Sequence, residues 1–443
     1  MRAGRLLWLA RRNLRRRLLS TSLTTLSVAL GVGLFAALGA LRRTVEEGFQ
    51  RSAQICDTVV GPRGSALDLV LTTLYHLGTS SGNVPFSLYE ELHETPGVRW
   101  AVPLAQGDTW RGYRVLGVTD TLFRDVEIPG LGPLAFAAGE AWSFGHEDLS
   151  AFHRRLAEHF QGGRPEEEEA GPVAGRPEWL AGVIGSEVAA RTGLGVGDVF
   201  VPAHDLAGAG GEAHEEAACR VTGVLEPTGT PLDRALFIPL GAFYSIAGHQ
   251  PREDSSFGGA RDPLGLSAIL LRTQPGFYQI SIWRRINDRQ DAMAARPVDE
   301  VLKLFQVVGS VDQALRLVAA LVVAVALVGV MVALYNAMGA RRREFAVLRA
   351  LGARRRTVLA LVLAESGTIS LAGGFLGLIL AGAAALAAGG YVEEALGLPL
   401  RVWPGAAELL LLPAVGLSGA LAGLVPAWTA YRTEAARHLG SHA

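Results

Sequence analysis

The sequence predicts a membrane protein with four transmembrane α-helices and a large mixed α/β extracytoplasmic domain inserted between helices 1 and 2. Three observations predict this fold class. The 443-residue chain is 49% hydrophobic and 19% charged, with a mean hydropathy of +0.27, which is apolar for a protein that lies wholly in water. Four windows are apolar over the roughly 20 residues that a bilayer-spanning helix needs. A long polar insert separates the first window from the other three.

These windows divide the chain into nine segments. They are a basic cytoplasmic N-terminal segment (1–17), transmembrane helix 1 (18–41), the extracytoplasmic or periplasmic domain (42–313), helix 2 (314–339), a cytoplasmic helix (340–356), helix 3 (357–390), an extracytoplasmic loop (391–405), helix 4 (406–430) and a cytoplasmic tail (431–443). The first window is longer than the apolar part of a signal peptide, about 7–15 residues, so we expect an uncleaved anchor.

Arginine placement predicts the orientation, because basic residues in short flanks stay on the cytoplasmic side of a membrane. Arginines crowd the segment before the first span and the loop between the second and third spans, whereas the next loop has Glu393, Glu394 and only Arg401. We therefore expect a multi-pass protein of the bacterial cytoplasmic (inner) membrane, with both termini inside and the large domain outside.

The insert carries both kinds of secondary-structure pattern. Runs rich in β-branched residues and bounded by Gly or Pro predict strands at 111–118, 219–227, 234–240 and 266–273. Apolar residues at helical spacing predict helices at 85–95, 148–160 and 298–315. We expect the last of these helices to continue directly into the second span.

The segment "RRREFAVLRALGARRRTV" (341–358) is strongly basic, although it lies between two very apolar windows. On a helix, Phe345, Leu348 and Gly352 share one side and the arginines gather at the ends. The arginines could hold lipid phosphates while the apolar side lies on the membrane. Alternatively, the apolar side could fit a groove on a soluble partner.

Two stretches, "NLRRRLLSTSLTTLSVALGVGLF" (13–35) and "RRREFAVLRALGARRRTVLALVLAES" (341–366), together with the large insert, resemble the MacB/FtsX-like permeases of ABC transporters. That family includes lipoprotein-release permeases. In architecture the resemblance covers nearly the whole chain, and its most specific part is the E-x-A-x-L-R-A-L-G-A core at 344–353.

The resemblance implies that the basic segment is the coupling helix that docks into an ATP-hydrolysing subunit. The residues that carry this role over are Arg343, Glu344, Phe345, Leu348, Arg349, Leu351 and Gly352. The chain's only lysine, Lys303, lies in "EVLKLF" and not in a phosphate-binding Gly-Lys-Ser/Thr loop, so we expect no ATP hydrolysis and no cofactor in this chain.

The expected partners are two copies of a separate ABC ATPase subunit and a second permease copy, in a homodimer or a related heterodimer. Membrane lipid and a periplasmic or lipoprotein partner are also expected, and no nucleic acid. The expected function is that of a permease subunit which couples ATP hydrolysis to a conformational change of the outside domain, for export or release of a lipoprotein, peptide or amphiphile. Two alternatives stay open: a zinc-linked transport component, and a regulator that transmits force to an external enzyme without transport.

Glu365 lies within the third span, where an ionisable group is costly, so it is either a structural hydrogen-bonding residue or a conformational switch. Arg316 and Glu408 are expected near the outer interface, reaching water without a special role. His204 and His214 lie in loops rich in carboxylates, which is zinc-binding chemistry, but their spacing matches no standard metal motif.

Two further patterns leave alternatives open. Cys56 and Cys219 both fall in the outside domain, where a disulfide is permitted but not required. Small residues recur at four-residue spacing in three spans, which lets helices approach closely either within one subunit or across a dimer. These stripes are Ala29, Gly33 and Ala37; Gly329, Ala333 and Ala337; and Gly373, Gly377 and Ala381.

Overall fold

The computed structural model describes residue 12 and residues 17–161, 180–203, 218–246, 256–257, 260–261, 264–340, 354–396 and 405–432. The chain divides into two compact units. The outside unit comprises residues 46–306, and the membrane unit comprises residues 1–45 and 307–443. Each unit has its own core.

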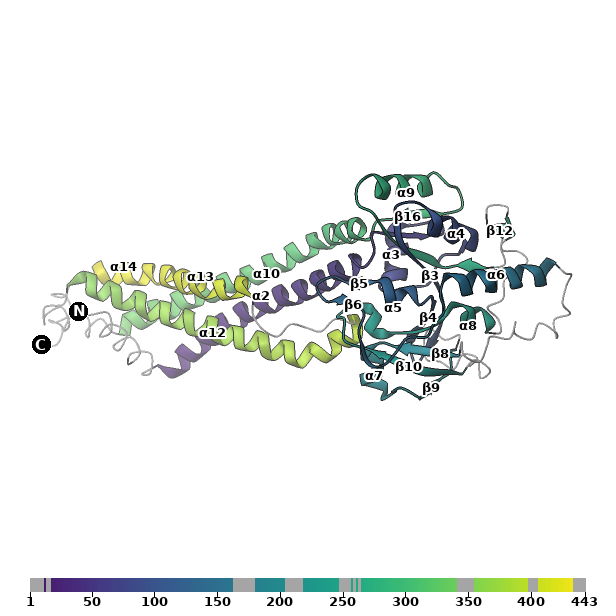
Figure 1. Cartoon of the computed structure of the whole chain (residues 1–443). Coiled ribbons are helices and arrows are strands. Elements are labelled where there is room, and N and C mark those ends of the chain that lie inside the picture. Colours follow the sequence, from purple (N-terminus) through teal and green to yellow (C-terminus); the bar gives the residue numbers. More distant parts are fainter. Residues whose placement is uncertain are drawn as a thin grey trace, which may run out of the picture. The chain divides into compact units, whose positions relative to one another are not determined.

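The outside unit is built on a mixed sheet, which in the described residues has ten strands (Figure 1). Its order is β16-β1-β15-β3-β4-β11-β8-β10-β7, with β9 paired to β10. The strands are β1 (Thr58–Gly61), β3 (Val98–Trp110), β4 (Tyr113–Val118), β7 (Phe136–Gly139), β8 (Ala181–Ile184), β9 (Val199–Phe200), β10 (Cys219–Leu225), β11 (Ala235–Pro239), β15 (Ala268–Thr273) and β16 (Met293–Ala295).

The sheet is buried on both faces at its centre. Every residue of β1, β8 and β11 is buried, as expected for strands covered on both sides, whereas burial alternates along β10. The covering helices are α3 (Ala66–Leu74), α4 (Phe86–Glu94), α5 (Thr121–Asp125), α6 (His146–Gln161), α7 (Ser186–Thr192), η3 (Pro231–Arg234), α8 (Leu240–Ser245) and α9 (Phe277–Asn287). Short pairs are β2 (Val84–Pro85) with β14 (Gly265–Leu266), β5 (Glu127–Ile128) with β6 (Gly132–Pro133), and β12 (Ser256–Phe257) with β13 (Ala260–Arg261).

The strands predicted at 111–118, 219–227, 234–240 and 266–273 are confirmed as β4, β10, β11 and β15. The helices predicted at 85–95 and 148–160 are confirmed as α4 and α6. The longest strand, β3, is not among the predicted elements.

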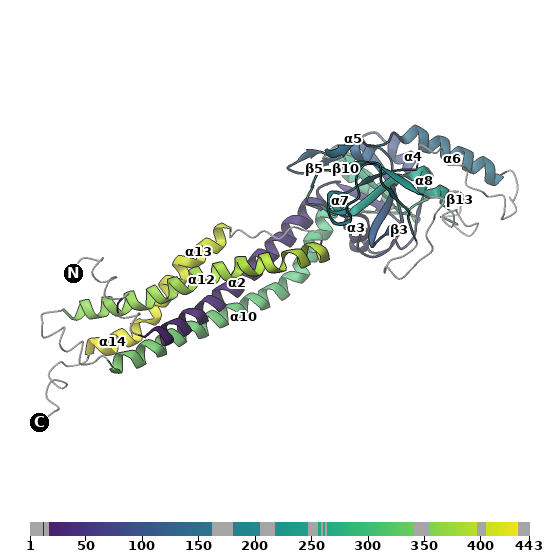
Figure 2. The ribbon, with the colours of Figure 1, turned by 90° about the horizontal axis from the view of Figure 1, so that it is seen from below.

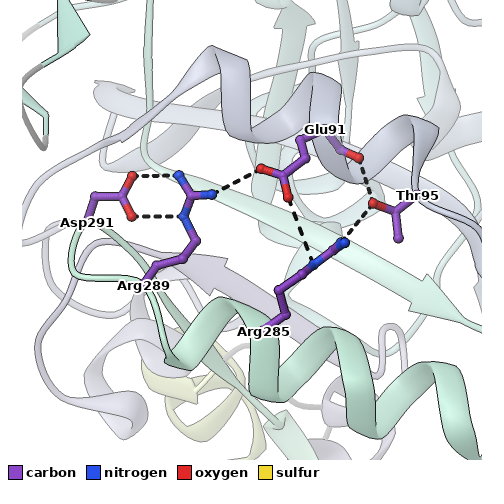
Figure 3. A network of polar contacts seen from close by, with 5 residues as sticks. All are labelled: Glu91, Thr95, Arg285, Arg289 and Asp291. Atoms are coloured by element: carbon purple, nitrogen blue, oxygen red, sulfur yellow. Dashed lines mark hydrogen bonds and ion pairs between the residues drawn. The ribbon is translucent and has the colours of Figure 1, made fainter.

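A polar network fastens α9 to α4 (Figure 3). The Arg289 guanidinium donates to both carboxylate oxygens of Asp291, at 2.9 and 2.8 Å, and to Glu91 Oε2 at 3.0 Å. Arg285 donates to Thr95 Oγ1 at 2.8 Å and lies 3.9 Å from Glu91 Oε1. The hydrogen bonds from Arg289 lower the pKa of Asp291 and, in turn, raise that of Arg289. Bidentate geometry of this kind holds the end of α9 in a defined position.

Within the described residues, four helices are long and apolar enough to cross a membrane, at Leu18–Ala53, Pro297–Met338, Arg356–Tyr391 and Glu408–Trp428. The first two extend from the membrane unit into the outside unit. The four belong to α2 (Leu18–Ala53), α10 (Pro297–Ala340), α12 (Arg355–Leu396), and α13 (Ala406–Ala422) with α14 (Leu424–Arg432). Figure 2 shows these helices running lengthwise beside one another. α10 spans both the helix predicted at 298–315 and the second span, so the expected continuity is confirmed. The predicted end of the first transmembrane span at residue 41 lies inside α2, and the predicted start of the second at residue 314 lies inside α10. These two membrane boundaries therefore stay predictions.

Candidate functional site

The predicted coupling residues lie outside the described residues. Arg343, Glu344, Phe345, Leu348, Arg349, Leu351 and Gly352 belong to the segment between Ala340, the last residue of α10, and Arg355, the first residue of α12. Their role stays a prediction. The structure does describe α10 and α12, which flank this segment, and the helices α2 and α13 that pack against them.

Helices α2 and α12 approach each other closely through glycines. A Cβ added at Gly377 would lie 2.7 Å from Ala29 O and 3.0 Å from Gly33 N, and one added at Gly33 would lie 3.1 Å from Gly377 O. At these distances backbone meets backbone, which only small residues permit. Two of the three small-residue stripes therefore pack against each other within one subunit.

Glycines also let helices α12 and α13 approach each other, here against side chains. A Cβ at Gly374 would lie 3.2 Å from Leu412 Cδ2, and one at Gly419 would collide with the Ser370 side chain. The stripe on α10 differs, because a Cβ at Gly329 meets no atom of the described residues within 4 Å. Among the residues that the structure describes, none packs against α10 at Gly329.

An arginine clasp joins three helices of the membrane unit, and we define it as Arg42, Arg43, Asp312, Arg316 and Glu408. Arg42 of α2 lies 2.5 Å from Asp312 Oδ2 of α10, which also pairs with Arg316 at 3.0 Å. Arg43 of α2 pairs with Glu408 of α13, and Glu408 Oε2 accepts a hydrogen bond from Gly405 N at 2.9 Å.

The clasp corrects the expectation for Glu408. The Glu408 side chain is only 7% exposed and pairs with Arg43, so it does not reach towards water. Its role is structural, because it joins α13 to α2. Arg316 is 42% exposed but is committed to Asp312. Removing Arg43 would leave the buried Glu408 carboxylate without its charged partner, which is destabilising. The sequence signal that was available is the presence of acidic and basic residues at the ends of three apolar windows.

Glu365 of α12 is buried at 5% exposure, together with Ser366 and Ser370 of the same helix. Ser366 Oγ donates back to Val362 O at 3.2 Å. The burial places Glu365 in the interior of the membrane unit, which both of its predicted roles require. Its role as structural residue or switch stays a prediction.

The two candidate zinc ligands, His204 and His214, lie outside the described residues. In the parts of the chain that the structure describes, no three His, Cys, Asp or Glu side chains are grouped as a metal site would need. Two other histidines do meet: the rings of His93 and His146 stack at 3.8 Å, and His146 Nδ1 lies 3.2 Å from the Tyr89 hydroxyl. Burial and the neighbouring His146 lower the pKa of His93.

Cys56 and Cys219 are both buried, and neither forms a disulfide. Burial, with a contribution from the charge of Asp108, raises the pKa of Cys219 to about 12. Burial also raises the pKa of Cys56. Both thiols are therefore protonated and shielded at neutral pH, which is the behaviour of structural cysteines.

Two family models match this chain. That of the MacB-like periplasmic core domain matches residues 21–295, and that of the FtsX-like permease C-terminal region matches residues 316–435. Together with four apolar helices and a mixed α/β domain, these matches define a membrane-embedded permease component of ABC transporters. The chain belongs to the MacB/FtsX-like permease family.

Solved structures give two weaker similarities. The crystal structure of the periplasmic region of MacB from Actinobacillus actinomycetemcomitans is 9% identical, covers 57% of this chain and 95% of its own, and has a TM-score of 0.31. The extracellular domain of the noncanonic ABC-type transporter YknZ from Gram-positive bacteria is 14% identical, covers 54% of this chain and 100% of its own, and has a TM-score of 0.28. A search of the curated proteins found no match.

Membership of the family establishes the coarse function. The chain is a membrane protein with an extracellular domain, and it is a permease component of a kind that is generally not itself catalytic. Homologues in this family work with ABC ATPase partners and often dimerise.

Proposed function

We propose that this chain is the subunit through which a separate ATPase, bound in two copies, changes the conformation of the outside unit. The ATPase docks on the coupling segment at Phe345, Leu348 and Leu351, with Arg343, Glu344 and Arg349 at the rim and Gly352 ending the helix. The change in the outside unit serves the export or release of a lipoprotein, a peptide or an amphiphile. A second permease copy, identical or related, completes the assembly.

The continuity of α10 is the observation that carries this proposal. This helix begins at Pro297, two residues after β16 ends, and stops at Ala340, directly before the coupling segment. Its 44 residues correspond to about 66 Å at 1.5 Å per residue. No proline follows Pro297 within it, so the usual cause of a kink is absent. The continuity of this helix supports the proposal that a displacement at Ala340 acts on the outside unit through α10.

The second rod is α2, which ends at Ala53, shortly before β1 begins at Thr58. β1 and β16 are neighbours in the sheet and run antiparallel, with Val59 opposite Ala295. The two helices that contain the first and second apolar stretches thus lead into adjacent strands. Relative motion of the two helices would act on this strand pair first, which supports the sheet edge as the place where force enters the outside unit.

The test is co-purification of the full-length permease with its ATPase. Phe345→Asp combined with Leu348→Asp should abolish the complex, because a carboxylate cannot be buried in an apolar groove without a large desolvation cost. Membrane insertion should be unchanged. The matched control is Phe277→Asp, the same change at a residue of α9 that is 79% exposed, and it should leave ATPase binding intact. Undiminished ATPase binding by the double variant would contradict the docking proposal.

A further inference from the structure

The outside unit contains a cavity of about 870 Å³ that neither the coupling segment nor the clasp uses. Its walls come from the chain just after α2, from β3 and β15, from the β5–β6 hairpin, from α9 and from the first turn of α10. We call it the hairpin pocket, after the hairpin of residues 127–133. Gln279, in the first turn of α9, lines the pocket. The network of Arg285 and Arg289 fastens the other end of the same helix (Figure 3).

Three arginines line the hairpin pocket. Arg272 uses one terminal nitrogen to donate to the carbonyl oxygens of Gln54 and Ile55, at 2.7 and 2.6 Å. It lies over Trp100, 5.8 Å from the ring centroid. A guanidinium has five N–H donors, so Arg272 keeps donors beyond these two. Arg99 is exposed and has no hydrogen-bond or ion-pair partner among the described residues, whereas Arg296 is paired with Asp299 at 3.0 Å.

The acidic residues of the pocket differ in whether their carboxylates already have hydrogen-bond or ion-pair partners. Asp57 Oδ2 accepts from Thr273 N and Oγ1, at 2.8 and 2.9 Å. Asp125 is paired with Arg124 at 3.1 Å. Glu127 is exposed, and within the described parts of the chain nothing pairs with it. The pocket therefore presents both an uncommitted guanidinium group and an uncommitted carboxylate, which suits a ligand with charges of both signs.

Exposed apolar side chains accompany these charges. Leu131 at the tip of the hairpin is 59% exposed, and Val298 in the first turn of α10 is 40% exposed, and both line the pocket. Val298 belongs to α10, and Gln54 directly follows α2, so the chain reaches the pocket from both of these long apolar helices. A polar cavity with apolar residues at its walls suits an amphiphile, which has a charged headgroup and an apolar remainder.

We propose that the hairpin pocket binds the zwitterionic phosphoethanolamine headgroup of a phospholipid. Arg99 and Arg272 bind the phosphate, for which guanidinium groups are the preferred partners. Glu127 receives the ammonium group, and Leu131 and Val298 contact the start of the acyl chains. This inference goes beyond the proposed function, because binding a headgroup requires neither the ATPase nor a transported substrate.

Binding is measured on the full-length chain in detergent by titration calorimetry, without the ATPase. The probes are short-chain phosphatidylethanolamine and phosphatidylglycerol below their micellar concentrations, soluble O-phosphoethanolamine and inorganic phosphate. The main variant is Arg99→Glu, at a position that has no partner within the described parts of the chain. Its matched control is Arg154→Glu, the same charge reversal at an exposed residue of α6 that does not line the pocket.

Arg99→Glu should weaken phosphatidylethanolamine binding about tenfold or more, because a charge-assisted contact becomes a repulsive one, and Arg154→Glu should not. Glu127→Gln should remove the preference for phosphatidylethanolamine over phosphatidylglycerol. Leu131→Asp should weaken binding of the lipid but not of O-phosphoethanolamine.

Three results would overturn the proposal. Inorganic phosphate binding as tightly as the lipid would identify free phosphate as the ligand. Equal losses in Arg99→Glu and Arg154→Glu would show a general effect of surface charge. The absence of saturable binding by the wild-type chain would show that the pocket takes no headgroup.

Discussion

The outside unit and the membrane unit bury different kinds of side chain. The largest fully buried side chains of the outside unit are aromatic and include Phe86, Tyr89 and Phe237. In the membrane unit the main core cluster of described residues consists of Val28, Val32, Ala326, Val330, Leu334, Ile369 and Val415. Between its helices α2 and α12, the contacts are made by glycines that meet backbone atoms.

The difference follows from the two solvents. In water, burying a large apolar side chain gains free energy roughly in proportion to the area removed from water. In lipid no such gain exists, because the acyl chains are as apolar as the side chains, so helices associate through close packing and polar contacts. The glycine contacts and the arginine clasp are the two forms that this packing takes here.

Phe237→Ala should have the largest effect, and it should act on the outside unit. Phe237 is fully buried on β11 and packs edge-on against Phe123 at 5.7 Å, so its loss leaves a cavity that costs about 3–5 kcal/mol. Chemical unfolding of the purified protein, followed by near-UV circular dichroism, measures the change. Phe277→Ala, at a residue that is 79% exposed, is the control and should cost less than about 0.5 kcal/mol. Similar costs for the two variants would contradict the assigned core.

Gly377→Leu should have the next largest effect, and it should act on the membrane unit. A Cβ here would meet Ala29 O at 2.7 Å, and overpacking costs about 1–3 kcal/mol, because backbone atoms cannot turn aside as a side chain can. Gly329→Leu is the matched control within the same kind of stripe. Thermal unfolding in detergent should show a loss for Gly377→Leu alone. If Gly329→Leu abolished the dimer without lowering thermal stability, the second permease copy would contact the face of α10 that carries Gly329.

Part of this fold can be predicted from the sequence, because it depends on the pattern of neighbouring residues. The four apolar helices and the continuity of α10 follow from runs of neighbouring residues, and so do β4, β10, β11 and β15. The strand β3 is different. It contains Pro103 opposite Ile269, and its pairing slips between Gln106 and Thr109, beside Gly107 and Asp108. Proline argues against a central strand and Gly-Asp suggests a turn, so the local signals oppose the structure that the sheet imposes.

The ion pairs of the arginine clasp could not be predicted from the sequence, for a different reason. Arg42 and Asp312 are 270 residues apart in the chain, and Arg43 and Glu408 are 365 apart. One sequence contains no record of which distant charges meet, and an acidic residue near the end of an apolar window usually reaches water. Pairing within the bundle overrides that tendency for Glu408. The coupling segment, in contrast, is assigned from its amphipathic pattern and family resemblance, and its residues lie outside the described part of the chain.

The smallest of the expected effects is a change of stability with pH that belongs to the outside unit and not to the membrane unit. His76, in the outside unit, is half-buried, and desolvation together with Arg114 and Arg234 lowers its pKa to about 4. An unfolded chain binds the proton near pH 6.5, the ordinary value for histidine. Between these two values the unfolded state therefore holds more protons than the folded state. The free energy of unfolding falls as the pH drops from 6.5 towards 4, and the full contribution of His76 is present above pH 6.5.

His76→Gln should remove this component. The difference in unfolding free energy between wild type and variant should be constant above pH 6.5 and should shift in favour of the variant as the pH falls to about 4, where it levels off. Acidic groups that titrate in the same window are common to both proteins and cancel in the difference. The shift should appear in the near-UV transition of the aromatic core and not in a transition of the apolar helices, because His76 belongs to the outside unit alone. A difference that stays flat from pH 8 to 4 would mean that His76 gains its proton as easily in the folded protein as in the unfolded chain.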